Sequence, residues 1–310
     1  MSSSVMPLNE TQAGMLARLA DYIELTKPRI TVMVVVSVAI AAFVASWGQP
    51  DPLIVWHALV WHALVGTLLT ASSASGMNQW LERGLDARMP RTQNRPLPAN
   101  RLSGQWVMAL VILTLVIGVA YLIWFVNPLT ALFSVLTWLV YVVAYTPLKT
   151  RTPLNTAVGA ISGALPILMG WATVGGSWSD PRWLALFAVV FFWQFPHFMA
   201  IAWIYRDQYK QAGMKMWPVV DPSGRRAGVE AVVGALILLP ISFVPLWFVP
   251  DSHAQLLLVF VMGMIQLSFA IRFCFGRNER SARQLLRMSL IYLPIYLLTL
   301  VTLPIGSFAL

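Results

Sequence analysis

The sequence predicts an all-α protein that crosses a membrane many times as one polytopic helical bundle. Of its 310 residues, 58% are hydrophobic and only 11% are charged, and the mean hydropathy is +0.70. A soluble domain would carry roughly 25% charged residues. Apolar runs of about 20 residues, the length that crosses a bilayer, recur along the whole chain. These observations exclude a soluble globular fold.

Nine apolar runs are expected to span the membrane. In chain order they are 30–48, 55–77, 105–126, 128–145, 154–174, 183–204, 228–249, 253–275 and 285–308. Pro28 precedes the first run and is a favoured residue in a first helical turn, whereas Pro196 lies inside the sixth run and can kink it. The connections at 78–104, 146–153, 205–227 and 276–284 carry most of the polar residues. We therefore expect an N-terminal segment, 1–29, followed by a single intramembrane domain, 30–310.

The distribution of positive charge predicts the orientation. Of the 21 lysines and arginines, all except Arg182 fall on the side of the N-terminus and the polar connections. By the positive-inside rule, that side faces the cytoplasm. Nine spans then place Leu310 on the periplasmic side. The net charge of +9 thus reflects topology, and no nucleic-acid partner is expected because no soluble basic face is present.

The N-terminal residues and the cysteine content predict the compartment. Residues 1–26 have no apolar signal-peptide core, and Glu10, Asp21 and Glu24 argue against an organelle transit peptide. Cys274 is the single cysteine, so no internal disulfide can form. A multi-pass protein of the bacterial cytoplasmic (inner) membrane is the simplest interpretation.

The most informative polar segment is 78–98. Asn78, Glu82 and Asp86 are four residues apart and therefore share one helix face, within reach of a common divalent cation. Arginines, whose forked donors suit phosphate, follow directly: Arg88, Arg91 and Arg95. Acids for magnesium beside arginines for phosphate indicate a diphosphate-binding site. The alternative is that the acids only pair with neighbouring arginines at the lipid interface.

Three further clusters lie on the same predicted side. The connection after the sixth run contains Tyr205, Arg206, Asp207 and Tyr209, and two facing acidic loops could bracket a diphosphate with two magnesium ions. Its alternative is an ordinary solvated loop. The third cluster, between the fourth and fifth runs, contains Lys149, Arg151 and Asn155. The fourth cluster, directly before the first run, contains Lys27 and Arg29. These could bind phosphate or simply obey the topology rule.

His197 is the histidine of greatest interest. It lies deep in the sixth run, beside Pro196 and near Gln194. An intramembrane ionisable residue is a functional candidate. The alternative is a core histidine bonded to a neighbouring helix.

With these residues in view, the chain resembles the protohaem IX farnesyltransferase (haem O synthase) family, a branch of the intramembrane aromatic prenyltransferase superfamily. The matching stretches are Glu24–Ile30, Asn78–Pro98, Tyr145–Lys149 and Trp193–Gly213, spread over nearly the whole chain. Glu82, where the superfamily usually has aspartate, and the Phe-Pro-His-Phe stretch are similar to the haem-specific branch. One departure is Gln208, where members usually have an acid, and Asp207 would have to substitute.

The resemblance implies that farnesyl diphosphate alkylates a vinyl group of haem B, with addition of water, to give haem O. It implies a magnesium ion at Glu82 and Asp86, a second at Asp207, and catalytic roles for Asn78, Glu82, Asp86 and Lys149. The implied substrate-binding residues are Lys27, Arg29, Arg88, Arg91, Arg95, Arg151, Asn155, His197, Tyr205, Arg206 and Tyr209. Haem B is then a substrate rather than a resident cofactor. The implied partners are the bilayer and a haem A synthase or terminal oxidase assembly factors.

Two other functions stay open. A quinone-pathway prenyltransferase would use the same diphosphate machinery with a phenolic acceptor, although His197 and Glu82 argue against it. A membrane transporter would place charged or broken helices near the bilayer midplane, whereas the acids here cluster at one end of the predicted spans.

Overall fold

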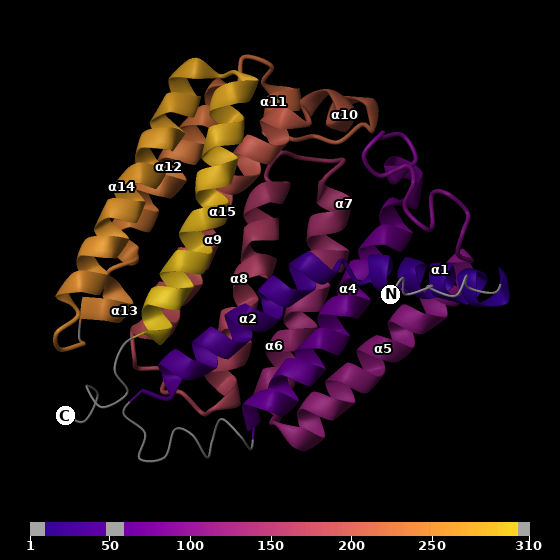
Figure 1. The fold of residues 1–310 in the computed structure, drawn as a ribbon, viewed down its shortest axis with the longest axis horizontal. Helices are drawn as coiled ribbons and strands as arrows, with labels where there is room; N and C mark the ends of the chain where they lie inside the picture. Colours follow the sequence, from indigo (N-terminus) through magenta and orange to yellow (C-terminus); the bar gives the residue numbers. More distant parts are fainter. Residues whose placement is uncertain (1–9, 48–58, 248, 303–310) are drawn as a thin grey trace, which may run out of the picture.

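Long α-helices make up most of the described chain, residues 10–47, 59–247 and 249–302 of a computed structural model (Figure 1). Eight described helical segments are long and apolar enough to cross a membrane. They are α2 (Pro28–Ala45), α5 (Gly104–Phe125), the continuous segment Pro128–Leu148, α8 (Asn155–Thr173), α9 (Arg182–Ile204), the segment Arg225–Trp247, α14 (His253–Gly276) and α15 (Glu279–Val301). The predicted all-α, multi-pass membrane fold is confirmed.

The second predicted span corresponds to α4 (Trp61–Asp86), which is not among those eight because its second half is polar. It packs beside α2 and α5 and continues past the predicted end at 77, so that the acids lie on its last turns. Residues 55–58 of this prediction lie outside the described residues, as do 48, 248 and 303–308 of three others.

One predicted span starts earlier than expected, and two others are irregular inside. α15 begins at Glu279, six residues before the predicted 285, because Asn278 caps it and accepts a hydrogen bond from the Ser281 amide at 2.9 Å. The predicted span 228–249 is two helices, α12 (Arg225–Ile241) and α13 (Val244–Trp247). The predicted span 128–145 begins as α6 (Pro128–Leu139), turns into a π-helix, η2 (Val140–Tyr145), and ends in α7 (Thr146–Leu148).

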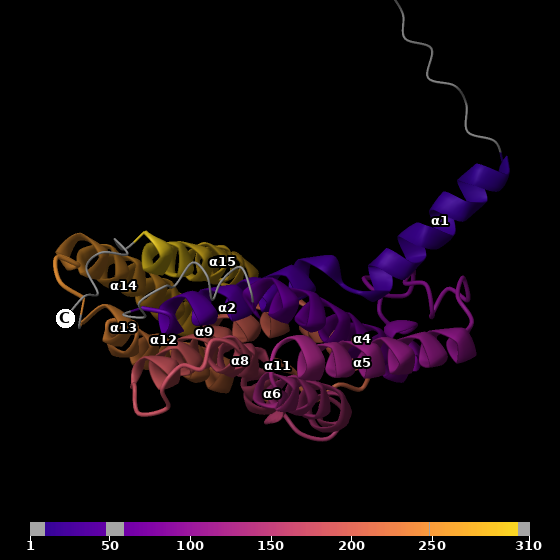
Figure 2. The ribbon, with the colours of Figure 1, turned by 90° about the horizontal axis from the view of Figure 1, so that it is seen from below.

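Three further helices were not predicted: α1 (Glu10–Leu25), α10 (Arg206–Gln211) and α11 (Trp217–Val220). Figure 2 shows α1 projecting away from the bundle. Between α1 and α2, Lys27 adopts the left-handed conformation, with φ of 47°. This sharp junction turns the chain into the bundle beside α4.

Close helix packing brings distant segments side by side. A Cβ on Gly170 of α8 would lie 2.1 Å from the Val38 carbonyl oxygen of α2, so only glycine permits this approach. A Cβ on Gly118 of α5 would lie 2.9 Å from the Leu69 Cβ of α4. Consequently α8 lies directly against α2, and α5 lies directly against α4. α12, α14 and α15 form the other side of the molecule (Figure 1).

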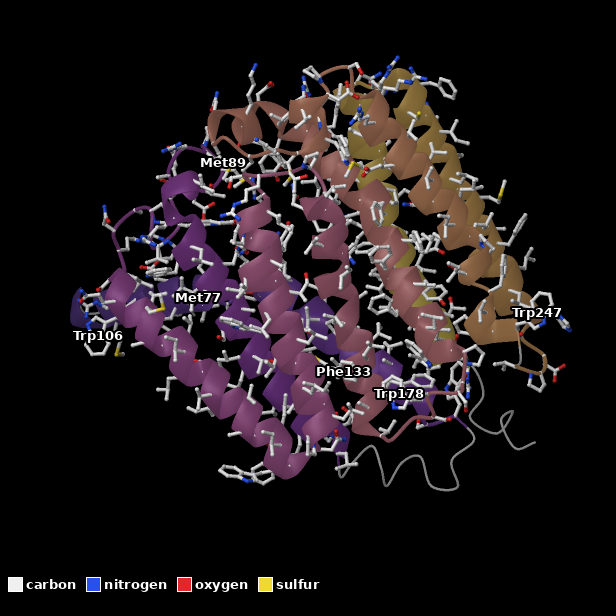
Figure 3. The ribbon with its side chains drawn as sticks, turned by 180° about the vertical axis from the view of Figure 1, so that it is seen from behind. Met77, Met89, Trp106, Phe133, Trp178 and Trp247 are labelled. Atoms are coloured by element: carbon white, nitrogen blue, oxygen red, sulfur yellow. The ribbon has the colours of Figure 1, made fainter. Side chains whose placement is uncertain are left out.

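The polar connections gather at one end of the bundle. Met89, in the connection after α4, lies at the end that carries α10 and α11, whereas Trp178, between α8 and α9, lies toward the opposite end (Figure 3). Which end faces the cytoplasm stays a prediction from the charge distribution.

Candidate functional site

The site is built on the last turns of α4. Asn78, Glu82 and Asp86 are 0%, 4% and 1% exposed, although all three are polar. Burying such groups is unfavourable unless they are paired. Each of them contacts a group from elsewhere in the chain.

Three cations complete these contacts. Lys27 Nζ donates to Asn78 Oδ1 at 2.6 Å, and Lys149 Nζ lies 2.7 Å from Glu82 Oε1. Arg95 donates from its guanidinium to Asp86 Oδ2 at 2.7 Å. The arrangement thus pairs each α4 side chain with one base.

Local structure positions these cations. The connection after α4 folds back because the Thr92 hydroxyl donates to the Asp86 carbonyl at 2.9 Å, which returns Arg95 to the helix end. Lys149 directly follows α7, whose Thr146 hydroxyl accepts from Asn78 Nδ2 at 3.0 Å. The π-helix η2 directly precedes α7, and such π-helical turns are often found at functional sites.

The connection between α10 and α11 closes the site. The Lys215 amide donates to the Lys149 carbonyl at 2.6 Å. Asn155, at the start of α8, donates from Nδ2 to the Thr152 carbonyl at 2.6 Å and the Lys215 carbonyl at 3.1 Å. Its Oδ1 is buried without a hydrogen-bond partner in the described structure, so Asn155 has an oxygen available to a ligand.

These residues surround a cavity of about 110 Å³. Its polar lining contains two carboxylates and four cations, and the rest is largely apolar or aromatic. The lining residues are Lys27, Glu82, Asp86, Met89, Arg91, Arg95, Tyr145, Lys149, Asn155, Thr156, Gly159, Phe198, Ile201, Ala202, Tyr209, Met214 and Met216. An excess of positive charge next to an apolar wall suits an anionic group attached to a hydrocarbon.

Electrostatics within the cavity are strongly coupled. Burial lowers the pKa of Lys27 to about 7, although Glu82 attracts its charged form. Burial is also the largest single effect on Lys149 and would lower its pKa, but the Glu82 carboxylate together with Tyr145 and Tyr141 raises the pKa above its usual value. Burial would likewise raise the pKa of Glu82, and Lys149 and Lys27 together hold it below its usual value. Glu82 is therefore ionised at neutral pH, and Lys27 is the base whose charge changes there.

The oxygen atoms that the protein offers could fill only part of the coordination sphere of a magnesium ion. Carboxylate and amide oxygens from Glu82, Asp86 and Asn155 line the cavity, and magnesium prefers one or two carboxylates together with substrate phosphate oxygens. Among the described residues no group of three or more His, Cys, Asp or Glu could form a complete protein cage. The residues present thus fit a metal ion that arrives with, and is shared by, a phosphorylated substrate.

Several predicted site residues lie outside the cavity lining. Four of them are exposed: Arg29, Arg88, Arg151 and Asp207. Tyr205 also lies outside the lining, and its ring centre is 5.0 Å from the guanidinium of Arg91, which does line the cavity. Arg206 donates to the Trp203 carbonyl at 2.9 Å, so its side chain lies against the end of α9.

His197 also faces away from the lining. Its Nδ1 lies 2.9 Å from the Ser289 hydroxyl of α15, and its ring stacks on Trp193 with centroids 4.8 Å apart. The next residue, Phe198, lines the cavity instead. Since adjacent helical residues are rotated by about 100°, His197 occupies the neighbouring face of α9.

Sequence reasoning missed part of the lining. Tyr145 covers Lys149, with Nζ 4.6 Å from the ring centre. Gly159 makes room for that ring, because a Cβ there would lie 2.7 Å from Tyr145 Cε2. The cations of the stretch that begins at Tyr145 are visible in the sequence, but no sequence signal links its ring to Gly159 on another helix.

Known proteins resemble this chain over most of its length. The model of the UbiA prenyltransferase family matches residues 34–293. A protoheme IX farnesyltransferase of Rhodopirellula baltica is 41% identical over 288 residues, which cover 90% of this chain and 98% of that protein. A protoheme IX farnesyltransferase of Koribacter versatilis is 38% identical, with 95% and 96% covered.

Solved structures share the fold. A digeranylgeranylglyceryl phosphate synthase structure superposes with a TM-score of 0.74 at 15% identity, covering 94% of this chain and 99% of that one. A UbiA homologue from Archaeoglobus fulgidus, bound to DMAPP and Mg²⁺, gives a TM-score of 0.64 at 16% identity, with 91% and 98% covered. At these identities the likeness concerns the fold.

Proposed function

Because the chain belongs to the UbiA prenyltransferase family and is a membrane-embedded prenyltransferase, we propose that it transfers a farnesyl group from farnesyl diphosphate to a vinyl group of haem B. Water adds in the same reaction, so the products are haem O and diphosphate. The names of its relatives support this choice of substrates. The observation that carries it is that two buried carboxylates and the Asn78 amide are each paired with a cation around one cavity.

We propose that substrate binding exchanges the ion pairs. Without substrate, Lys149 and Arg95 neutralise Glu82 and Asp86. The carboxylates would turn to magnesium, together with the free Oδ1 of Asn155, and the released cations would turn to the diphosphate. When bound, magnesium would neutralise charge on the departing diphosphate. Each buried charge would therefore have a partner of opposite charge both without substrate and with substrate bound.

The chain's own residues would carry the bond-breaking step. Lys27, Lys149 and Arg95 would stabilise the negative charge that develops as the allylic C–O bond breaks. The electron pair leaves with the diphosphate, and the farnesyl carbon becomes cationic. Met214 and Phe198 in the lining would keep water away until the vinyl electrons attack. The Tyr145 ring, which already faces Lys149, could face this cation as well.

His197 remains our candidate for haem binding. Its contact with Ser289 and its stack on Trp193 give it a fixed orientation, and imidazole is a common haem ligand. We expect His197→Ala to weaken haem binding in the absorption spectrum of purified protein, and Ser289→Ala to have a smaller effect. An unchanged haem absorption spectrum in His197→Ala would show that this residue has a purely structural role.

We further propose that the cavity end faces the cytoplasm of a bacterium, in its inner membrane, as the one-sided distribution of lysine and arginine supports. Haem O would then pass to a haem A synthase or to terminal oxidase assembly. A reporter fused within residues 210–220 should read as cytoplasmic. A periplasmic readout would show that the protein has the opposite orientation in the membrane.

The decisive experiment incubates purified protein with farnesyl diphosphate, haem B and magnesium and determines pigment mass and diphosphate release. Glu82→Gln and Asp86→Asn should remove most turnover. Asp180→Asn is the matched control, because Asp180 pairs with Arg182 outside the cavity lining. Farnesylation of a phenolic acceptor in place of haem would instead support the quinone-pathway alternative.

A further inference from the structure

One face of α15 carries a row of exposed arginines. Arg280, Arg283 and Arg287 are separated by three and four residues and are all exposed. At 3.6 residues per turn they lie within about 60° of one another around the helix. Together with Glu279 and Gln284 they line a shallow groove of about 550 Å³. This row is separate from the cavity described above.

Most of this charge is available. Arg283 pairs with Glu279, whereas Arg280 and Arg287 make no side-chain hydrogen bond or ion pair with any residue that the structure describes. Arginine presents forked donors that match phosphate oxygens. The groove therefore offers two uncommitted guanidinium groups, with Arg283 between them in sequence.

The same face becomes apolar further along the helix. Leu290, Ile291 and Leu298 are 53%, 50% and 61% exposed, and their positions around α15 continue the arginine row. α15 is one of the helices long and apolar enough to cross a membrane. A phosphate-binding row thus runs directly into a surface suited to acyl chains.

We propose that this face of α15 binds an anionic phospholipid, with the headgroup phosphate on Arg280 and Arg287 and the acyl chains along Leu290, Ile291 and Leu298. Charge complementarity and the continuous apolar surface select this occupant. An acidic protein at the helix end would leave the apolar part of the face without a role. Free phosphate would use only the arginines.

The test measures lipid retention by the full chain. Protein purified in neutral detergent is titrated with mixed phosphatidylglycerol and phosphatidylcholine, and the lipids bound are counted by native mass spectrometry. The wild-type protein should retain phosphatidylglycerol preferentially. Arg280→Gln combined with Arg287→Gln should reduce that preference by roughly 10- to 30-fold, because each juxtamembrane cation contributes about 1 kcal/mol.

Two controls make the outcome specific. Arg18→Gln combined with Lys210→Gln removes the same charge from exposed positions outside the membrane-spanning segments and should retain the wild-type preference. Replacing Arg280 and Arg287 with lysine keeps charge but removes the fork, and should give an intermediate preference. Inorganic phosphate at equal concentration should not displace the lipid.

Three results would overturn the proposal. The first is an unchanged lipid preference in the double glutamine variant. The second is an equal loss in the matched control. The third is complete displacement of the lipid by inorganic phosphate. Loss of a co-purifying acidic protein with unchanged lipid retention would assign the face to a protein partner instead.

Discussion

The buried pair of Glu82 and Lys149 allows stability and catalysis to be separated. Lys149 Nζ and Glu82 Oε1 lie 2.7 Å apart, and the side chains of Lys149 and Glu82 are 11% and 6% exposed, respectively. We consider Glu82→Gln, Lys149→Met and the two changes combined. Each single change leaves one buried charge without its nearest partner, whereas the double change removes both charges.

The structure gives the expected magnitudes. Removal of one partner from a buried pair lowers the free energy of unfolding by about 3–5 kcal/mol, while replacement of both by neutral groups is often close to neutral. Lys27 also attracts Glu82, so Lys149→Met should fall at the low end of that range. The expected coupling energy of the cycle is then about 3 kcal/mol.

The assay combines unfolding and turnover of the purified protein. Free energies of unfolding are measured in one detergent for all four proteins, and turnover with farnesyl diphosphate is measured in parallel. The double variant should recover most of the lost stability and still turn over at least about 100-fold more slowly, because leaving-group stabilisation is absent. Additive losses of stability would refute the buried-pair reasoning. Near-normal turnover in the double variant would refute the catalytic assignment.

Three further outcomes are expected. Gly159→Ala places a Cβ 2.7 Å from the Tyr145 ring and should lower the free energy of unfolding by about 1–3 kcal/mol and reduce turnover in the same assays. Gly84→Ala, with nothing within 4 Å, should leave both intact. The pKa of Lys27 is lowered to about 7, so the apparent KM for prenyl diphosphate should rise as the pH increases through 7 and lysine loses its charge, an effect that Lys27→Arg should abolish. The unfolded lysine keeps a pKa of about 10.4, so the unfolded state binds more protons between these values and the contribution of Lys27 to stability should increase with pH across that window. Asp207 is exposed outside the cavity, so Asp207→Asn should retain most turnover, and a severe loss would mean that its loop closes over the substrate.

The local composition of the sequence was sufficient to predict that the protein is a bundle of membrane-spanning helices. Hydropathy and length are properties of each segment alone, so the positions of the spans could be predicted, with end errors such as the start of α15 at Glu279. α1 and α10 were missed because short or amphipathic helices carry no long apolar run. Spacing alone also placed Asn78, Glu82 and Asp86 on one helix face.

The sequence by itself determined which residue types are available to the site, and the tertiary structure decided which of them meet. Asn78 contacts Lys27 across 51 positions, and the Glu82–Lys149 and Asp86–Arg95 pairs depend on how α4, α7 and the following connection pack. The rotation of a helix about its own axis is set by contacts with other helices. For this reason α9 turns Phe198 toward the cavity and His197 toward Ser289, a distinction that adjacent sequence positions do not contain.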